Sequence, residues 1–154
     1  MSSQLTTQLN GVVIRSISKY TDHRGWLMEL FRDDELPKGF EPTMGYVSMT
    51  HPGVSRGPHE HVDQTDGFCF LNGTYELGLW ENRPGCAPHH EMHTVGEDNP
   101  VVVIVPPGVV HAYRNVGDKD AWVLNFPDRL YAGWGKTEPV DEIRHEEIDS
   151  EFKW

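Results

Sequence analysis

Three histidines and an aspartate stand at spacings that suit a metal ion or a proton transfer. His59 and His61 are two residues apart, and Asp66 follows after four more residues. Side chains two apart on a strand point to the same face, so His59 and His61 can share one pocket. His111 lies in a second segment, after the turn residues Pro106-Pro107-Gly108. The intervening chain can bring all four side chains together.

This set of side chains predicts two kinds of chemistry. Three imidazoles and a carboxylate suit a first-row divalent ion such as Zn, Fe, Mn or Ni, with room left in its shell for water or substrate. A free imidazole would instead act as a general base. The two roles conflict at His59, because a nitrogen bonded to a metal cannot also take a proton. The sequence leaves the choice open.

A second histidine cluster reads His-His-Glu-Met-His, from His89 to His93. Its spacing differs from the His-Glu-x-x-His pattern of metalloproteases. We expect an exposed polar hairpin here that binds metal weakly.

Short β-like runs separated by turn signals recur along the chain. Apolar and polar side chains alternate from Thr74 to Trp80, which is the period of a strand. Val101–Val105 is a continuous β-branched run, typical of a strand covered on both faces. Asn72-Gly73 predicts a tight hairpin turn. The expected strands are Val12–Ile17, Trp26–Arg32, Met44–Met49, Gly67–Asn72, Tyr75–Trp80, Val101–Val105, Ala112–Val116 and Trp122–Phe126.

The length and composition favour a single all-β domain over residues 1–154, either a sandwich or a barrel. We expect the barrel core from about residue 11 to residue 135, and an acidic tail from about 136 to 154 that forms a short helix or an arm across the barrel. A net charge of −11 argues against a nucleic-acid partner. The sequence has neither a membrane-length apolar run nor a secretory signal pattern, so we expect a cytoplasmic protein without a membrane partner.

Both histidine segments resemble the two motifs of the cupin superfamily. The first is Gly, five residues, His-x-His, three or four residues, Glu, six residues, Gly; Asp66 replaces the Glu here. The second ends in Pro-x-Gly, two residues, His, three residues, Asn. The matching residues are Gly53, His59, His61, Asp66 and Gly73, then Pro106, Gly108, His111 and Asn115. The resemblance implies a double-stranded β-helix, or jelly-roll barrel, whose metal ligands would be His59, His61, Asp66 and His111.

Other segments resemble a narrower group, the dTDP-4-dehydrorhamnose 3,5-epimerase family and its RmlC-like sugar-nucleotide isomerase relatives. The family's opening motif is matched by Asp22-His23-Arg24-Gly25 with Glu29 and Phe31. Its catalytic strand is matched by Arg56-Gly57-Pro58-His59, and its late tyrosine by Tyr131.

This narrower resemblance implies an epimerase or isomerase of a dTDP-linked 4-keto-6-deoxy sugar in surface-polysaccharide synthesis. A ketone acidifies the neighbouring carbon, so His59 would remove a proton and Tyr131 would return one. Arg24 and Arg56 would hold the diphosphate, and Glu29 would contact the substrate. The resemblance also implies a homodimer formed by exchange of the N-terminal strand Val12–Ile17.

Several positions depart from the epimerase pattern. His61 stands where the family has Gln, and Asp66 stands where it has a substrate-contacting Lys. Met44 and Tyr46 lie near the positions of the Gln and Asn that read thymine, and the family's C-terminal Asp, the partner of the base, falls beyond this chain. Two alternatives therefore stay open: a metal-dependent cupin of another class, such as a dioxygenase or metal-assisted isomerase, and a non-catalytic sugar-binding module.

Overall fold

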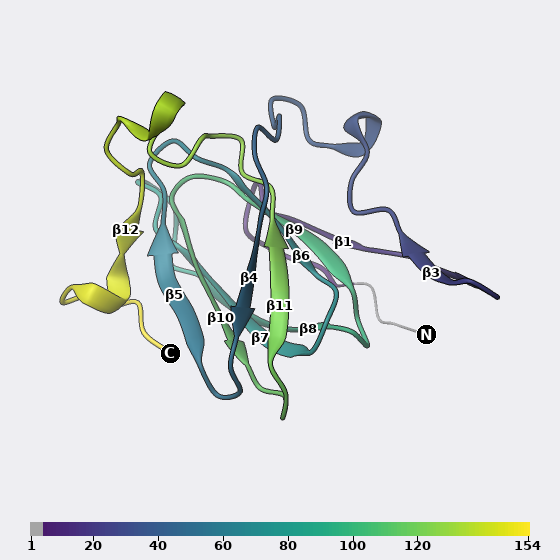
Figure 1. Ribbon diagram of the computed structural model, residues 1–154. Coiled ribbons are helices and arrows are strands. Elements are labelled where there is room, and N and C mark those ends of the chain that lie inside the picture. Colours follow the sequence, from purple (N-terminus) through teal and green to yellow (C-terminus); the bar gives the residue numbers. More distant parts are fainter. Residues whose placement is uncertain (1–4) are drawn as a thin grey trace.

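The computed structural model describes residues 5–154 as two facing five-stranded antiparallel sheets and a separate hairpin (Figure 1). The first sheet has the order β1 (Val13–Ser16), β9 (Val101–Val105), β6 (Asp66–Phe70), β11 (Ala121–Asn125) and β4 (Tyr46–Thr50). The second has the order β12 (Ile143–Arg144), β5 (Ser55–Glu60), β10 (Val109–Asn115), β7 (Thr74–Glu81) and β8 (His90–Gly96). The hairpin pairs β2 (Lys19–Asp22) with β3 (Gly25–Met28).

The only helical turns in residues 5–154 are three short 3₁₀ segments, η1 (Asp33–Glu35), η2 (Trp134–Lys136) and η3 (His145–Glu147). The predicted all-β jelly-roll class is therefore confirmed. Among the residues that the structure describes, no helix has the length and apolar character needed to cross a membrane.

The connection at Asn72-Gly73 shows where local pattern misleads. Gly73 has a φ of +68°, and a Cβ there would lie 2.3 Å from Cβ of Ala121, so only glycine fits. However, β6 pairs with β9 and β11, whereas β7 pairs with β8 and β10. The turn thus carries the chain from one sheet to the other, and the predicted hairpin between β6 and β7 is wrong.

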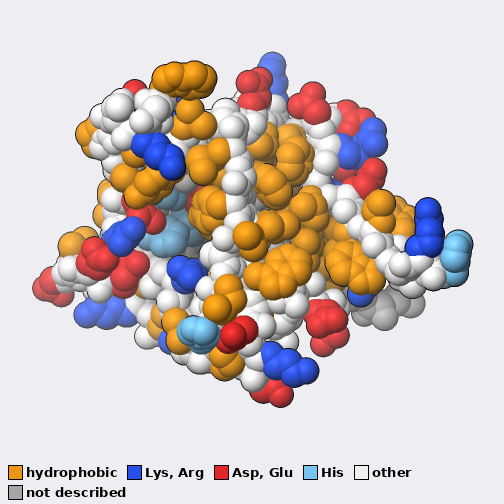
Figure 2. Space-filling view, viewed as in Figure 1, with side chains coloured by type: hydrophobic (Ala, Val, Ile, Leu, Met, Phe, Trp, Pro, Cys, Tyr) orange, Lys and Arg blue, Asp and Glu red, His pale blue; other side chains and the backbone are white. Residues whose placement is uncertain are grey.

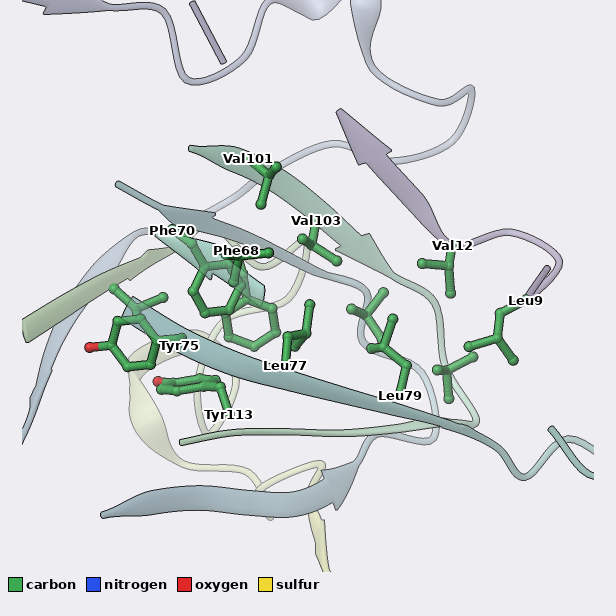
Figure 3. Packing of buried hydrophobic residues seen from close by; sticks show 14 of the residues in the cluster. Leu9, Val12, Phe68, Phe70, Tyr75, Leu77, Leu79, Val101, Val103 and Tyr113 are labelled. Atoms are coloured by element: carbon green, nitrogen blue, oxygen red, sulfur yellow. The ribbon is translucent and has the colours of Figure 1, made fainter. Parts of the chain in front are cut away.

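The hydrophobic core lies between the two sheets (Figure 3). Phe70, Tyr75 and Tyr113 pack edge to face, with ring centroids 5.5–5.7 Å apart. Such pairs add about 0.5–1.5 kcal/mol to the stabilisation that comes from burial of their surface. Phe68 joins this group and also packs against the ring of His111 at 5.4 Å. The core therefore forms one wall of the histidine site.

The C-terminal tail runs along the barrel as an arm. Ile143 and Arg144 form β12 against β5. Behind them His145 is buried, and its Nε2 lies 2.8 Å from Oε1 of Glu60. The last residue, Trp154, lies under the guanidinium of Arg114 at 4.7 Å. These contacts hold the preceding tail residues next to the histidines.

At the N-terminal side, β1 pairs with β9 of its own chain. The strand expected to exchange between subunits is therefore part of this chain's own sheet. The β2–β3 hairpin instead projects away from the barrel (Figure 1). It exposes large hydrophobic side chains, with Tyr20 and Leu27 60% exposed and Trp26 55% exposed.

Candidate active site

Three imidazoles meet at one end of the barrel, as the sequence predicts. His59 on β5 pairs directly with His111 on β10, and their ring centroids are 4.4 Å apart. His61 follows the end of β5, with its ring centroid 5.9 Å from that of His59. Each of the three residues offers a ring nitrogen, and these nitrogens lie within 4.8 Å of one another. Histidine atoms are visible at the base of a hollow in Figure 2.

Gly57 allows β5 to approach β10 closely enough for this meeting. Its φ is +85°, and a Cβ there would lie 2.6 Å from the carbonyl oxygen of His111 and 3.1 Å from Nδ1 of His59. The pairing of β5 with β10 shifts register between His111 and Tyr113. A side chain at position 57 would push the two strands apart and separate His59 from His111.

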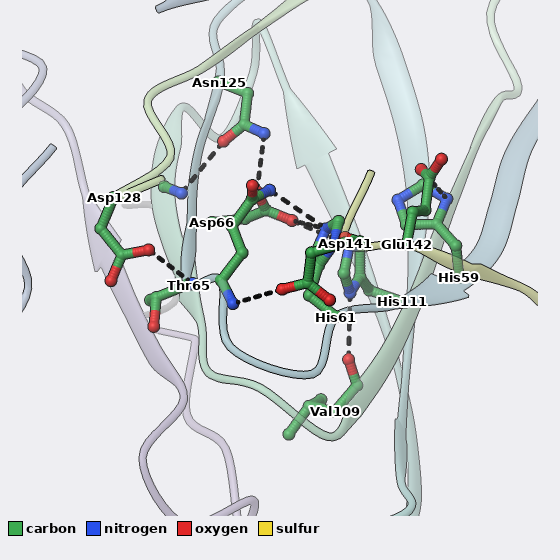
Figure 4. A network of polar contacts seen from close by, with 12 residues as sticks. His59, His61, Thr65, Asp66, Val109, His111, Asn125, Asp128, Asp141 and Glu142 are labelled. Atoms are coloured by element: carbon green, nitrogen blue, oxygen red, sulfur yellow. Dashed lines mark hydrogen bonds and ion pairs between the residues drawn. The ribbon is translucent and has the colours of Figure 1, made fainter. Parts of the chain in front are cut away.

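Asp66 reaches the same centre from the other sheet (Figure 4). Its Oδ2 lies 2.8 Å from Nε2 of His61 and 3.2 Å from Nε2 of His111. Its Oδ1 accepts hydrogen bonds from the side-chain amides of Gln64, at 2.8 Å, and Asn125, at 3.0 Å. Burial acts to raise the pKa of Asp66, but the close approach of His111 and the hydrogen bond with His61 outweigh burial and lower that pKa well below its ordinary value. Asp66 is therefore a buried, fully engaged carboxylate.

Backbone carbonyls fix the orientation of two of the rings. Nδ1–H of His111 donates to the carbonyl of Val109 at 3.0 Å, and Nδ1–H of His61 donates to the carbonyl of Asp141. Both rings therefore turn Nε2 toward Asp66. Burial acts to lower the pKa of His61, but the hydrogen bond and charge of Asp66 raise it to about 9. At neutral pH His61 and Asp66 thus form an ion pair.

His59 differs from its two neighbours, because its side chain makes no hydrogen bond with the residues that the structure describes. Burial lowers the pKa of His59 well below its ordinary value, and the nearby His111 and His61 lower it further. The ring is therefore neutral at pH 7 and able to accept a proton. Oε1 of Glu142 lies 3.9 Å from its Nδ1, close enough to favour the imidazolium once a proton arrives.

Two adjoining cavities open beside the histidines. The inner cavity, about 410 Å³, is lined by His59, His61, Arg56, Phe68 and Tyr113, among others. The outer cavity, about 560 Å³, lies under the loop that carries Tyr131. The residues that line both are Tyr46, His61, Glu142 and Arg144. Cavities of this size hold small organic ligands.

The predicted substrate-binding residues divide between these cavities and the hairpin. Arg56 lines the inner cavity, where its Nη2 donates to the carbonyl of Met49 at 2.7 Å. Tyr131 lines the outer cavity and is 56% exposed. Arg24 lies at the tip of the β2–β3 hairpin, paired with Asp22 at 2.6 Å. Neither Arg24 nor Glu29 is among the residues lining the two cavities.

Sequence reasoning missed the contribution of the tail. The carboxylate of Asp141 accepts the backbone N–H groups of Val62, Asp63 and Gln64 at 2.7–2.9 Å, and so fixes the loop after His61. The next residue, Glu142, faces His59. The signal that could have found them is the carboxylate that the epimerase family places beside its base near the C-terminus. Asp141 and Glu142 place their carboxylates near the histidines of this site.

The second histidine cluster is less exposed than expected. Glu91 and His93 lie on β8 with side chains only 11% and 10% exposed, so the prediction of an exposed hairpin is wrong for them. Glu91 lies 2.8 Å from Nε2 of His89 and 2.9 Å from Nε2 of His93. His90 points elsewhere and stacks on Trp80.

Comparisons with known proteins agree with this geometry. Residues 20–134 match a family described as the polysaccharide biosynthesis C-terminal domain. The chain is 33% identical over 126 residues to a probable low-salt glycan biosynthesis epimerase, Agl13, of Haloferax volcanii, covering 80% of this chain and 81% of that protein. It is 32% identical over 126 residues to the spore coat polysaccharide biosynthesis protein SpsL of Bacillus subtilis, covering 80% and 82%.

The fold is similar to those of solved sugar-nucleotide enzymes. The dTDP-6-deoxy-D-glucose-3,5-epimerase RmlC of Legionella pneumophila, solved with dTDP-4-keto-L-rhamnose, superposes with a TM-score of 0.77 at 20% identity, covering 91% of this chain and 75% of that one. A dTDP sugar isomerase of Desulfovibrio desulfuricans gives 0.77 at 20% identity, covering 88% and 83%. The fold is thus an RmlC-like cupin, and the chain belongs to the polysaccharide biosynthesis C-terminal domain family.

Proposed function

We propose that this chain is a sugar epimerase that inverts a carbon next to the ketone of a nucleotide-linked 4-keto-6-deoxy sugar, in the synthesis of a surface polysaccharide or glycan. The observation that carries the proposal is His59, a neutral imidazole in the inner cavity with a carboxylate 3.9 Å away. The names of the relatives and the ligand of the Legionella enzyme support the substrate class.

In the proposed reaction, His59 removes the proton from the carbon next to the ketone, and the electron pair of that C–H bond passes into an enolate. A tyrosine then returns a proton to the opposite face; resemblance assigns this role to Tyr131, which lines the outer cavity. Glu142 stabilises the imidazolium form of His59. Arg56 binds the diphosphate, a task that suits a guanidinium with paired donors.

The proposal is tested by incubating the purified chain with dTDP-4-keto-6-deoxyglucose and its UDP counterpart, and following product configuration by NMR. We expect inversion with at least one of the two nucleotides. Absence of inversion with every keto-sugar nucleotide in a broader panel would contradict the epimerase. Binding of these sugars without turnover would favour the sugar-binding module instead.

A metal-dependent reaction is the second candidate, and the donor set supports it. The ring nitrogens of His59, His61 and His111 are close enough to share one ion, and Asp66 would supply an oxygen ligand. Nε2 of His111 is buried without a hydrogen-bond partner among the described residues, while its Nδ1–H is held by a carbonyl, which is how metal-bound imidazoles are commonly fixed. A bound Zn, Fe, Mn or Ni ion would polarise a ligand oxygen.

Metal content of protein purified without added metal separates the two candidates. Near-stoichiometric metal that is lost in both His61→Ala and Asp66→Ala would favour the metal-dependent enzyme, and oxygen uptake with bound iron would point to its dioxygenase form. A metal-free, normally folded protein would favour His59 as a free base.

We also propose that the chain is a homodimer. We propose that the two subunits meet through the projecting hairpin and do not exchange β1. The hairpin and the edge strand β4 both expose large hydrophobic side chains, including Trp26, Leu27 and Val47. Figure 2 shows hydrophobic side chains gathered over one face of the molecule. Sedimentation analysis that gives a monomer at micromolar concentration would contradict this proposal.

The cytoplasmic location stays a prediction.

A further inference from the structure

Tyr46 occupies the junction of the two cavities. It is the first residue of β4, in the sheet opposite the one that carries His59, and it lines the inner and the outer cavity. Tyr131 lines the outer cavity only. Tyr46 lines the inner cavity as well, together with His59. Its side chain is partly accessible, since the residue is 46% exposed. A ligand in the inner cavity would therefore lie between His59 and Tyr46.

Hydrogen bonds around Asn125 decide where the Tyr46 proton points. The backbone N–H of Gly67 can only donate, so Oδ1 of Asn125 must face it, at 3.0 Å. The amide group of Asn125 then faces two acceptors, Oδ1 of Asp66 at 3.0 Å and the hydroxyl oxygen of Tyr46 at 2.9 Å. The Tyr46 oxygen is thus the acceptor in this bond. No residue in the described part of the chain accepts the Tyr46 proton, which can therefore be donated to a ligand in the cavities.

The protonation state of Tyr46 agrees with a donor role. Burial raises the pKa of Tyr46 above its ordinary value, and although the hydrogen bond from Asn125 lowers it, the charge of Asp66 adds to the increase. The side chain is therefore a neutral phenol at pH 7. The hydrogen bond from Asn125 would stabilise the phenolate that forms when the proton leaves.

We propose that Tyr46 is a proton donor in the epimerisation, delivering a proton to the face of the sugar opposite His59; this inference rests on the proposed function. His59 takes the proton from carbon, and the C–H electron pair forms the enolate double bond while the carbonyl pair moves to oxygen. The Tyr46 hydroxyl then gives its proton to the same carbon from the other side, and the ketone reforms. The imidazolium of His59 loses its proton to water and the Tyr46 phenolate regains one from water, which restores both groups.

Tyr46→Phe in deuterium oxide tests the assignment, because exchange and inversion can be measured separately. Without the donor, His59 still removes the proton and returns a deuteron to the same face. We expect Tyr46→Phe to keep deuterium exchange within about threefold of the wild type and to lose inversion by about 100-fold or more. Retained exchange also shows that the variant folds and binds substrate. Tyr75→Phe, a change in the hydrophobic core, serves as the matched control and should keep both activities.

Tyr131→Phe is measured in parallel. Inversion by Tyr46→Phe at the wild-type rate would overturn the role of Tyr46 and return the donor role to Tyr131. Loss of exchange together with inversion would also overturn it, because Tyr46 would then be needed for folding, substrate binding or proton removal and not only as the donor. A wild-type protein that neither exchanges nor inverts any keto-sugar nucleotide would overturn the proposed function itself.

Discussion

Two places in the barrel set a pair of histidines around one carboxylate, yet only one has the properties of an active site. In the first, Asp66 contacts His61 and His111; in the second, Glu91 contacts His89 and His93. The two sets are close in the sheet, since His111 pairs with Leu79 and Leu79 pairs with Glu91. Donor type and spacing alone therefore do not distinguish them.

The two sets differ in whether a polar side chain beside them is left without a hydrogen-bond partner. The N-terminal segment covers Glu91, and the backbone N–H of Gln8 donates to its carboxylate at 2.7 Å. The first set has an additional imidazole, His59, that makes no hydrogen bond within the described part of the chain and faces a cavity of about 410 Å³. A saturated cluster stabilises the fold, whereas a neutral group with a free lone pair beside open space can react.

The largest expected difference between the two sets is in metal affinity. His61→Ala removes a nitrogen from the group of three, so we expect zinc affinity to fall by about 100-fold or more, whereas His89→Ala should leave it unchanged. Titration calorimetry with a competing chelator measures both variants. Equal losses in the two would show that the clusters are equivalent and contradict the comparison.

A second prediction concerns stability at the Glu91 cluster. Burial acts to raise the pKa of Glu91, but the hydrogen bonds from Gln8, His93 and His89 lower it to about 2, compared with 4.5 ordinarily. A lowered carboxyl pKa stabilises the fold above the ordinary value, and this contribution is lost as pH falls through the folded value. Glu91→Gln should therefore reduce the free energy of unfolding by about 2 kcal/mol at pH 7, and the difference should shrink below pH 4.5 and vanish near pH 2.

Urea unfolding at several pH values tests this, with the exposed Glu97→Gln as control. Epimerase activity of folded Glu91→Gln should match the wild type. A pH-independent stability difference would show that the Glu91 charge contributes nothing.

The smallest expected effect concerns Glu142. Its carboxylate lies 3.9 Å from Nδ1 of His59 and favours the imidazolium, so Glu142→Gln should lower kcat about tenfold, which corresponds to about 1.4 kcal/mol. Glu147→Gln is the matched control, because Glu147 also pairs with Arg144 but is not among the residues lining the cavities. An equal effect in both variants would assign the loss to the Arg144 contacts instead.

The sequence predicted the centre of the site because its residues sit at fixed spacings on strands. His59, His61 and His111 converge as expected, and the β-branched run Val101–Val105 is β9 with all five residues buried. The sequence did not distinguish a hairpin within one sheet from a turn that crosses to the other sheet, since Asn72-Gly73 suits both connections. That choice depends on pairing with distant strands.

The rest of the site depends on tertiary placement that no local pattern encodes. Glu142 reaches His59 because the tail pairs with β5 and is held by the buried contact between His145 and Glu60. Conversely, Arg24 matches a family motif but lies on a hairpin that projects from the barrel. Tyr46 has no motif at all, and its free proton follows only from the bonding of Asn125.

The most direct test of the account is whether His59 itself removes the proton. Protein stripped of metal with a chelator is incubated with dTDP-4-keto-6-deoxyglucose in deuterium oxide, and label next to the ketone is followed by NMR for the wild type and His59→Asn. The account predicts rapid exchange by the stripped wild type and a rate at least about 1,000-fold lower in the variant. Exchange that disappears with the metal, or that persists in His59→Asn, would contradict it.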